Sequence, residues 1–121
     1  MSAESAPGSL EIGSRTEAAT VIVAVRGEID MASAPQLEAG LNDVLRTSPA
    51  TLVVDMSEVG FLGSAGLSVL LGASRSYPDT ELRIVATDAA RRPMELTGLD
   101  NMLAVFDSLK DALAVGKPTA G

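Results

Sequence analysis

A serine stands among residues with almost no side chain in the segment GFLGSAGLSVLL, residues 60–71. Ser64 follows Gly63 and precedes Ala65 and Gly66, at the start of a leucine-rich run with helical spacing. Serine is preferred at helix N-termini, so a structural capping role is one interpretation. The small neighbours also leave the hydroxyl open to another protein's active site, and a phosphate there would meet backbone N–H groups at the positive helix end. Ser64 is therefore the candidate phosphorylation site, with the catalyst supplied by a second protein.

Two carboxylates lie in the segment GEIDMAS, where Glu28 and Asp30 precede a predicted helix. Acidic residues at such positions commonly stabilise the helix dipole and cap the first turn. A functional role would require this turn to lie beside Ser64. Both turns follow predicted strands at their carboxyl ends, where open α/β sheets often place function. The two turns can therefore be neighbours on one rim of a sheet.

Asp55 follows a β-branched run, as the phosphorylated aspartate of a response-regulator receiver does. That chemistry needs neighbouring carboxylates to hold Mg²⁺ and a lysine at the end of the last strand. The first two predicted strands end in SRT and VRG, without an acidic pair. Phe106 is followed by Asp107, and Lys117 lies in the C-terminal tail. A role for Asp55 in capping the next turn is the preferred interpretation.

The glycines of the same region, Gly60, Gly63, Gly66 and Gly72, suggest a phosphate-binding loop. Their spacing does not match the known phosphate-loop motifs, and no lysine lies between the first and the last of them. The simpler interpretation is that small residues allow the loop and the following helix to pack closely against the strands.

The composition excludes several classes of function. The formal net charge is −7, which disfavours a nucleic-acid partner and favours a basic protein partner. Histidine and cysteine are absent, which excludes disulfides, thiolate metal sites and Ser-His-Asp catalysis within the chain. Two Phe and one Tyr offer little surface for stacking a flavin or a nucleobase. We expect no cofactor, no bound metal and no enzymatic activity.

The chain of 121 residues has the length of one domain. Residues 10–115 are expected to form this domain, between flexible tails at 1–9 and 116–121. No segment is long and apolar enough to span a bilayer, and residues 1–9 lack the features of a secretory signal. The expected location is the cytoplasm, without a membrane partner.

Strand-like and helix-like patterns alternate along the chain. Ser33, Pro35 and Gln36 have the spacing of a capping box, followed by an apolar stripe that extends to about Arg46. The predicted strands are Leu10–Thr16, Thr20–Gly27, Ala50–Met56, Glu81–Thr87 and a short one in MLAVFD. A second helix is predicted from Ser64 to before Pro78, and a last one from Ser108 onward. A third is predicted between the cap Asp88 and Gly98, and Pro93 is expected either to shift its start to Arg92 or to distort its first turn.

The predicted order is β-β-α-β-α-β-α-β-α. Strands separated by helices require crossover connections, so most of the sheet should be parallel, with an antiparallel or mixed edge formed by the first two strands. The sequence therefore predicts an α/β sandwich, with a mixed and mostly parallel sheet of four to five strands and about four helices.

The segment VVDMSEVGFLGSAGLSVLL resembles the signature of STAS domains, and specifically of the bacterial anti-sigma factor antagonists. In that family a motif of the type D-[LMS]-S-x-V-x-F-[LM]-[DG]-S-x-G-L joins the central strand to the second helix. VRGEIDMASAPQLEAGL resembles the family's G-E-[LI]-D segment and first helix, and RRPMELTGLDNMLAVFDSLKDAL resembles its third helix, last strand and last helix. The resemblance extends from about Ala19 to Val115 and implies a STAS-type sandwich.

The resemblance also implies a partner-switching mechanism. The antagonist binds an anti-sigma factor, which then releases its sigma factor. The anti-sigma factor is a GHKL-type kinase that ends binding by phosphorylating the antagonist's serine, here Ser64, and a PPM-type phosphatase restores it. The expected partner-binding residues are Glu28, Asp30, Ser33, Gly63, Ser64, Ala65 and Gly66. The best-known members have an acid and a hydroxyl residue where this chain has Gly63 and Ala65.

Two alternatives come from other classes of function. A STAS subunit of a membrane lipid-transport ABC complex would use the same rim to bind an ATPase, without phosphorylation. A small nucleotide-binding or hydrolytic α/β enzyme would need catalytic groups that this composition does not provide. Copurification with a GHKL kinase or with an ABC ATPase distinguishes the first alternative, and turnover of ATP or GTP by the isolated chain tests the second.

Overall fold

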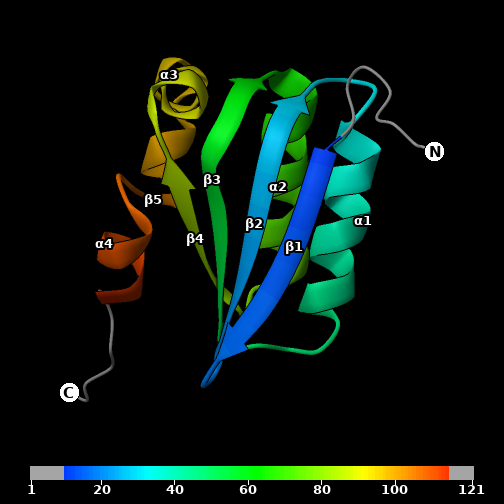
Figure 1. Cartoon of the computed structure of the whole chain (residues 1–121), viewed down its shortest axis with the longest axis vertical. Coiled ribbons are helices and arrows are strands. Elements are labelled where there is room, and N and C mark those ends of the chain that lie inside the picture. Colours follow the sequence, from blue (N-terminus) through cyan, green and yellow to red (C-terminus); the bar gives the residue numbers. More distant parts are fainter. Residues whose placement is uncertain (1–9, 115–121) are drawn as a thin grey trace.

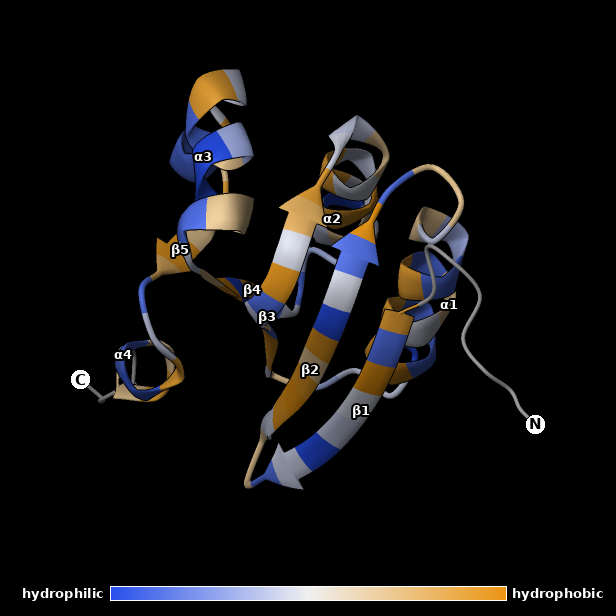
Figure 2. Ribbon diagram, turned by 45° about the horizontal axis from the view of Figure 1, so that its top comes forward, coloured by the Kyte–Doolittle hydropathy of each residue, from blue (hydrophilic) through white to orange (hydrophobic). Residues whose placement is uncertain are grey.

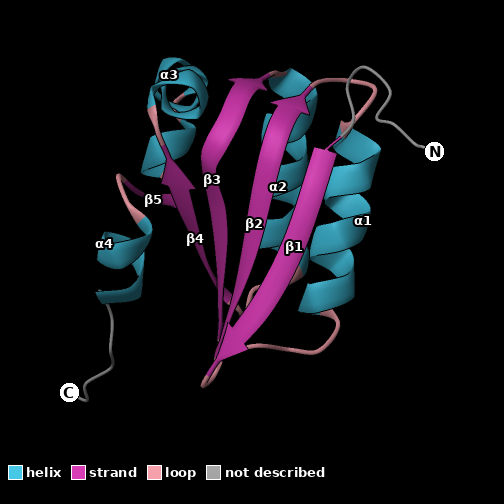
Figure 3. Cartoon of the chain, viewed as in Figure 1, coloured by secondary structure: helices cyan, strands magenta, loops and turns pink. Residues whose placement is uncertain are grey.

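Five strands form one sheet in the order β1-β2-β3-β4-β5, in a computed structural model that describes residues 10–114. Val115 and the predicted tails at 1–9 and 116–121 lie outside the described residues. β1 and β2 are antiparallel, and all later neighbours are parallel, as predicted (Figure 3). The strands are β1 Leu10–Glu17, β2 Thr20–Ile29, β3 Thr51–Leu62, β4 Glu81–Ala86 and β5 Ala104–Phe106. The helices are α1 Ala34–Leu45, α2 Ser64–Ser76, α3 Asp88–Thr97, the 3-10 helix η1 Leu99–Asn101 and α4 Leu109–Ala114.

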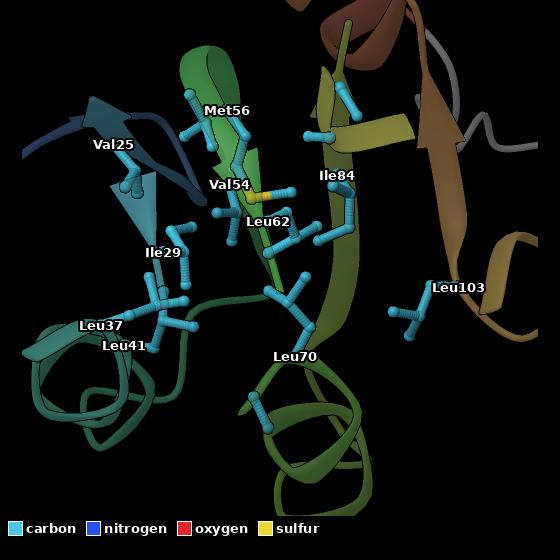
Figure 4. Close-up of a cluster of buried hydrophobic side chains, with 14 of the residues drawn as sticks. Val25, Ile29, Leu37, Leu41, Val54, Met56, Leu62, Leu70, Ile84 and Leu103 are labelled. Carbon is cyan, nitrogen blue, oxygen red and sulfur yellow. The ribbon is translucent and has the colours of Figure 1, made fainter. Parts of the chain in front are cut away.

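The main core lies between the sheet and the helices α1 and α2 (Figures 1 and 4). Leu37 and Leu41 of α1 and Leu70 of α2 are fully buried there, which confirms the predicted apolar stripes of both helices. They pack with the inward-facing residues of β2, β3 and β4, including Val25, Ile29, Val54, Met56, Leu62 and Ile84. Leu71, the next residue of the same leucine-rich run, is only half-buried.

The opposite face of the sheet is covered only in part. Ala112 of α4 packs there against Ile22, Val53 and Val85. Arg83 is only 4% exposed. Its guanidinium donates to the carbonyl oxygen of Ala112 at 2.7 Å and so holds α4 against this face. Within residues 10–114, β2 is therefore covered on both faces in its first part only, because Ala24, further along, is exposed. Figure 2 shows the corresponding hydropathy, which is continuously apolar in the first half of β2 and mixed in the second.

β3 is longer than predicted, because it continues six residues beyond Met56 to Leu62. β4 ends at Ala86, which is paired with Met56, so the second half of β3 has β2 on one side and α3 on the other. The register of β2 against β3 shifts between Ala24 and Arg26, and Ser57 and Glu58 are exposed in succession. This irregularity interrupts the alternating pattern and conceals the strand in the sequence.

The start of α1 also differs from its prediction. Ser33 occupies the N-cap position but its side chain makes no cap hydrogen bond. Gln36, expected in a capping box, instead bonds the edge strand: its Nε2 donates to the carbonyl oxygen of Leu10 at 2.7 Å, and its Oε1 accepts from the N–H of Leu10 at 3.3 Å. The predicted capping box is therefore wrong, because the Gln36 side-chain amide bonds the backbone of Leu10 in β1 and not the start of its own helix.

The boundaries of α3 were predicted in part. Gly98 ends the helix in the left-handed conformation, with φ of 78°, as expected for a glycine at this position. The N-cap is Thr87, whereas Asp88, the expected cap, is the first helical residue. Pro93 lies inside the helix and does not shift its start to Arg92. No helix formed by residues 10–114 is long and apolar enough to cross a membrane.

Candidate phosphorylation and partner-binding site

β2 and β3 end side by side, so the two turns that follow them are neighbours (Figure 1). Ile29 pairs with Leu62 in the sheet, and the N–H of Gly63 donates to the carbonyl oxygen of Ile29 at 2.9 Å. The predicted proximity of the two turns is therefore confirmed. We call residues 28–33 and 60–66 together the rim.

The turn between β2 and α1 is held by side-chain hydrogen bonds. One carboxylate oxygen of Asp30 accepts from the N–H groups of Ala32 and Ser33, each at 3.0 Å. The hydroxyl of Ser33 donates to the carbonyl oxygen of Glu28 at 2.7 Å and accepts from the N–H of Asp30 at 3.0 Å. These bonds, chiefly that from the Ser33 N–H, hold the pKa of the Asp30 carboxyl below its usual value.

The burial of this turn separates the predicted partner-binding residues. Ser33 is only 2% exposed. It therefore stabilises the turn from the buried side and has no exposed surface with which a partner could make contact. Asp30 is half-buried, with one oxygen engaged in the turn, whereas Glu28 is exposed. The Glu28 carboxylate reaches across to Gly60, where an added Cβ would lie 3.3 Å from its Oε2.

The turn between β3 and α2 has no such bonds. The N-cap residue of α2 is Gly63, which has no side chain that could cap the helix. Its carbonyl oxygen accepts from the N–H groups of Gly66 and Leu67 at 3.0 and 3.1 Å. Ser64 is the first helical residue, which confirms the predicted start of α2 and rules out the alternative interpretation that Ser64 is the N-cap. Its side chain is exposed, and its hydroxyl makes no hydrogen bond with any residue between 10 and 114.

Close packing takes the place of polar bonds in this second turn. A Cβ added to Gly66 would lie 2.4 Å from Cγ2 of Ile29 and 2.6 Å from Cδ1 of Leu62. The first turn of α2 can therefore rest on the ends of β2 and β3 only because residue 66 is glycine. Gly66 is buried and contributes to the rim by this packing, while Gly63 and Ala65 are half-buried at the surface.

Two apolar residues of the rim, Met31 and Phe61, were not predicted from the sequence. Met31 is 82% exposed and Phe61 is 51% exposed. A signal for Phe61 was present, because two adjacent apolar residues in a strand point to opposite faces, and Leu62 belongs to the core. Both residues belong to the rim that carries Ser64, and Met and aromatic side chains are enriched at protein interfaces.

Asp55 lies outside the rim, in the middle of β3 rather than at its end. It is half-buried, and its Oδ1 accepts from the N–H of Ser57 at 3.0 Å. This hydrogen bond is local, but the predicted role in capping the next turn is wrong, because β3 continues through Ser57 to Leu62. Asp107, the residue after Phe106, forms an ion pair with Arg91 of α3.

Comparison with known proteins identifies the class to which this fold and rim belong. The sequence matches the STAS domain family over residues 11–112, and the chain is a member of that family. The five-stranded mixed sheet with helices in this order is the STAS fold that the resemblance implied.

The relatives are anti-sigma factor antagonists. The chain is 36% identical over 111 residues to the anti-sigma-F factor antagonist RsfB of Mycobacterium tuberculosis, covering 90% of this chain and 91% of that one. It is 30% identical to the anti-sigma-B factor antagonist of Listeria monocytogenes, over 80% of this chain and 87% of the relative. The crystal structure of an anti-sigma factor antagonist from Mycobacterium paratuberculosis superposes with a TM-score of 0.79 at 38% identity, over 91% and 96% of the two chains.

Proposed function

We propose that this protein is an anti-sigma factor antagonist that binds a kinase-type anti-sigma factor and is switched off by phosphorylation of Ser64. The observation that carries the proposal is the exposed hydroxyl of Ser64, which has no hydrogen-bond partner among residues 10–114 and stands at the start of α2. The names of the relatives, in particular RsfB, support the choice of an anti-sigma factor as the partner.

The chain acts as the substrate of this reaction and not as its catalyst. The Ser64 oxygen attacks the γ-phosphorus of ATP held with Mg²⁺ by the GHKL-type anti-sigma factor. The bond from that phosphorus to the bridging oxygen breaks, ADP leaves, and a base of the kinase takes the hydroxyl proton. A PPM-type phosphatase reverses the state by hydrolysis, in which water replaces the serine oxygen and releases inorganic phosphate.

Electrostatics explain how the phosphate would end binding. A phosphoserine adds about −1.5 to −2 charges at pH 7. The exposed carboxylate of Glu28 and the ionised Asp30 already lie on the rim, and the whole chain carries a net charge of −7. A partner surface that fits the neutral hydroxyl has no cation directly opposite Ser64, so binding would desolvate the phosphate without a matching charge, which is costly. The switch is therefore local and needs no refolding of the domain.

The test is incubation with candidate GHKL-type anti-sigma factors, ATP and Mg²⁺, followed by mass spectrometry and calorimetry. We expect phosphate on Ser64, and Ser68→Ala, an exposed hydroxyl one turn further along α2, provides the matched control that is still phosphorylated. Ser64→Ala should bind the partner and resist inactivation. Ser64→Glu should bind about 100-fold more weakly, or about 2.7 kcal/mol.

Equal affinities of wild type, Ser64→Ala and Ser64→Glu would overturn the proposal. Capture of an ABC ATPase in place of a kinase would favour the transport-subunit alternative.

A further inference from the structure

The ring of Phe61 lies against the backbone of Gly63. A Cβ added to Gly63 would lie 3.1 Å from Cε2 and 3.3 Å from Cζ of this ring. The backbone of Gly63, with φ of −93° and ψ of −179°, is accessible to any residue, so the conformation itself does not require glycine. The space that a side chain at position 63 would use is instead taken by the aromatic ring, one residue before Ser64.

Met31 stands at the other turn of the rim, and its backbone is fixed. The hydrogen bonds between Asp30 and the N–H groups of Ala32 and Ser33 span Met31 and hold its backbone in place. Its side chain is 82% exposed. An apolar side chain held on a rigid turn loses little backbone entropy when it binds. Met and Phe are also enriched at the centres of protein interfaces, where charged residues are depleted.

Exposed side chains of this kind are few. Among residues 10–114, four large apolar side chains are exposed, namely Met31, Phe61, Leu96 and Met102. Two belong to the rim that carries Ser64, and the other two belong to α3 and to the end of η1. Carboxylates accompany the rim pair, because Glu28 reaches to Gly60 and Asp30 directly precedes Met31.

We propose that Met31 and Phe61 are the apolar anchors with which this antagonist binds its partner, and that Gly63 keeps the space for the Phe61 ring. The partner surface that fits is an apolar side chain of the kinase-type anti-sigma factor, flanked by basic residues that pair with Glu28 and Asp30. The family motif has this aromatic residue together with either an acid or a glycine before the serine. With the glycine, no side chain at position 63 stands beside the Phe61 ring, so the partner residue opposite position 63 is apolar. The inference rests on the proposed function and specifies the partner of the same site.

The experiment measures the affinity of unphosphorylated protein for the anti-sigma factor that phosphorylates Ser64. Phe61→Ser and Met31→Ser should each weaken binding 10-fold or more, as expected for interface anchors. Leu96→Ser and Met102→Ser remove equally exposed apolar side chains outside the rim and should change the affinity less than twofold. Circular dichroism and the melting temperature establish that all four variants are folded.

A double-mutant cycle tests the role of Gly63. Gly63→Ala should weaken binding in the presence of the ring, because the ring must shift by a few tenths of an ångström to make room for the added methyl group. In the Phe61→Ser background the same change should have no further effect. Additive losses would overturn the assigned role of Gly63.

The outcomes also separate this inference from the proposed function. If the wild type binds and is phosphorylated, but the Met31 and Phe61 variants bind as tightly as the Leu96 and Met102 variants, the inference fails and the proposed function stands. If the wild type neither binds nor accepts phosphate from any GHKL-type anti-sigma factor, both fail together.

Discussion

The two turns of the rim are stabilised by different means. The turn between β2 and α1 is closed by hydrogen bonds of the Asp30 carboxylate and the buried Ser33 hydroxyl. The turn between β3 and α2 has no side-chain cap and is closed by the contact of Gly66 with Ile29 and Leu62. Each turn contains a serine at a helix start, but only the first serine is needed for structure. The hydroxyl of Ser64 is therefore free for chemistry.

The largest effect is expected from removing the close packing of the second turn. Gly66→Ala places a methyl group within 2.4 Å of Ile29, and overpacking should lower the free energy of unfolding by about 3 kcal/mol. The control is Gly72→Ala in the same helix, where an added Cβ meets nothing within 4 Å and should stabilise the helix by up to about 1 kcal/mol. Urea denaturation measures both, and a change of the same sign at both positions would contradict the packing argument.

The next effect compares the two serines directly. Ser33→Ala leaves the carbonyl oxygen of Glu28 and the N–H of Asp30 without their partner and should cost about 2 kcal/mol of stability. Ser64→Ala removes an exposed hydroxyl that makes no hydrogen bond with residues 10–114 and should change stability by less than about 0.5 kcal/mol. Thermal and urea unfolding of the two variants give the comparison. Similar losses for both would mean that the second turn also depends on its serine.

A smaller effect is expected from the pH dependence of the first turn. The pKa of Asp30 is lowered in the folded state, so its ionised form contributes stability above the unfolded value of about 3.8, and this contribution is lost as the pH falls through the folded pKa. The stability difference between wild type and Asp30→Asn should therefore favour wild type near neutral pH and shrink below about pH 4. Urea denaturation between pH 7 and pH 3 measures it, and a difference independent of pH would show that the charge is unimportant.

The smallest effect concerns phosphorylation itself. Because Ser64 is exposed and lies at the positive end of α2, its phosphate should change the free energy of unfolding by no more than about 0.5 kcal/mol. Differential scanning calorimetry of phosphorylated and unphosphorylated protein measures this change. A large drop in melting temperature would indicate that the switch acts by unfolding the domain and not by charge at the contact surface.

Much of the fold could be predicted because it follows from local patterns. The apolar spacing in α1 and α2, the glycine that ends α3 and the alternation of strands with helices all appear in the sequence. The neighbourhood of the two turns was also predictable, since parallel strands end at the same edge of a sheet. The length of β3 was not, because its irregular pairing with β2 interrupts the alternation.

The roles of individual site residues depended on contacts between distant segments. Serine is favoured at both helix starts, and nothing local distinguishes Ser33, which bonds back to Glu28, from Ser64. Gln36 matches a capping box, but its partner Leu10 lies 26 residues earlier in the chain. The exposure of Phe61 follows from the burial of Leu62 only once the strand is known to continue so far.

The same Gln36 protects the outer edge of the sheet. An edge strand exposes backbone groups that can pair with a strand of another molecule and so begin aggregation. At Leu10, the apolar start of β1, the N–H and the carbonyl oxygen are both occupied by the Gln36 amide. One side chain of α1 thus makes the two hydrogen bonds that a neighbouring strand would make at Leu10. The backbone of this residue is therefore not available for pairing with a strand of another molecule.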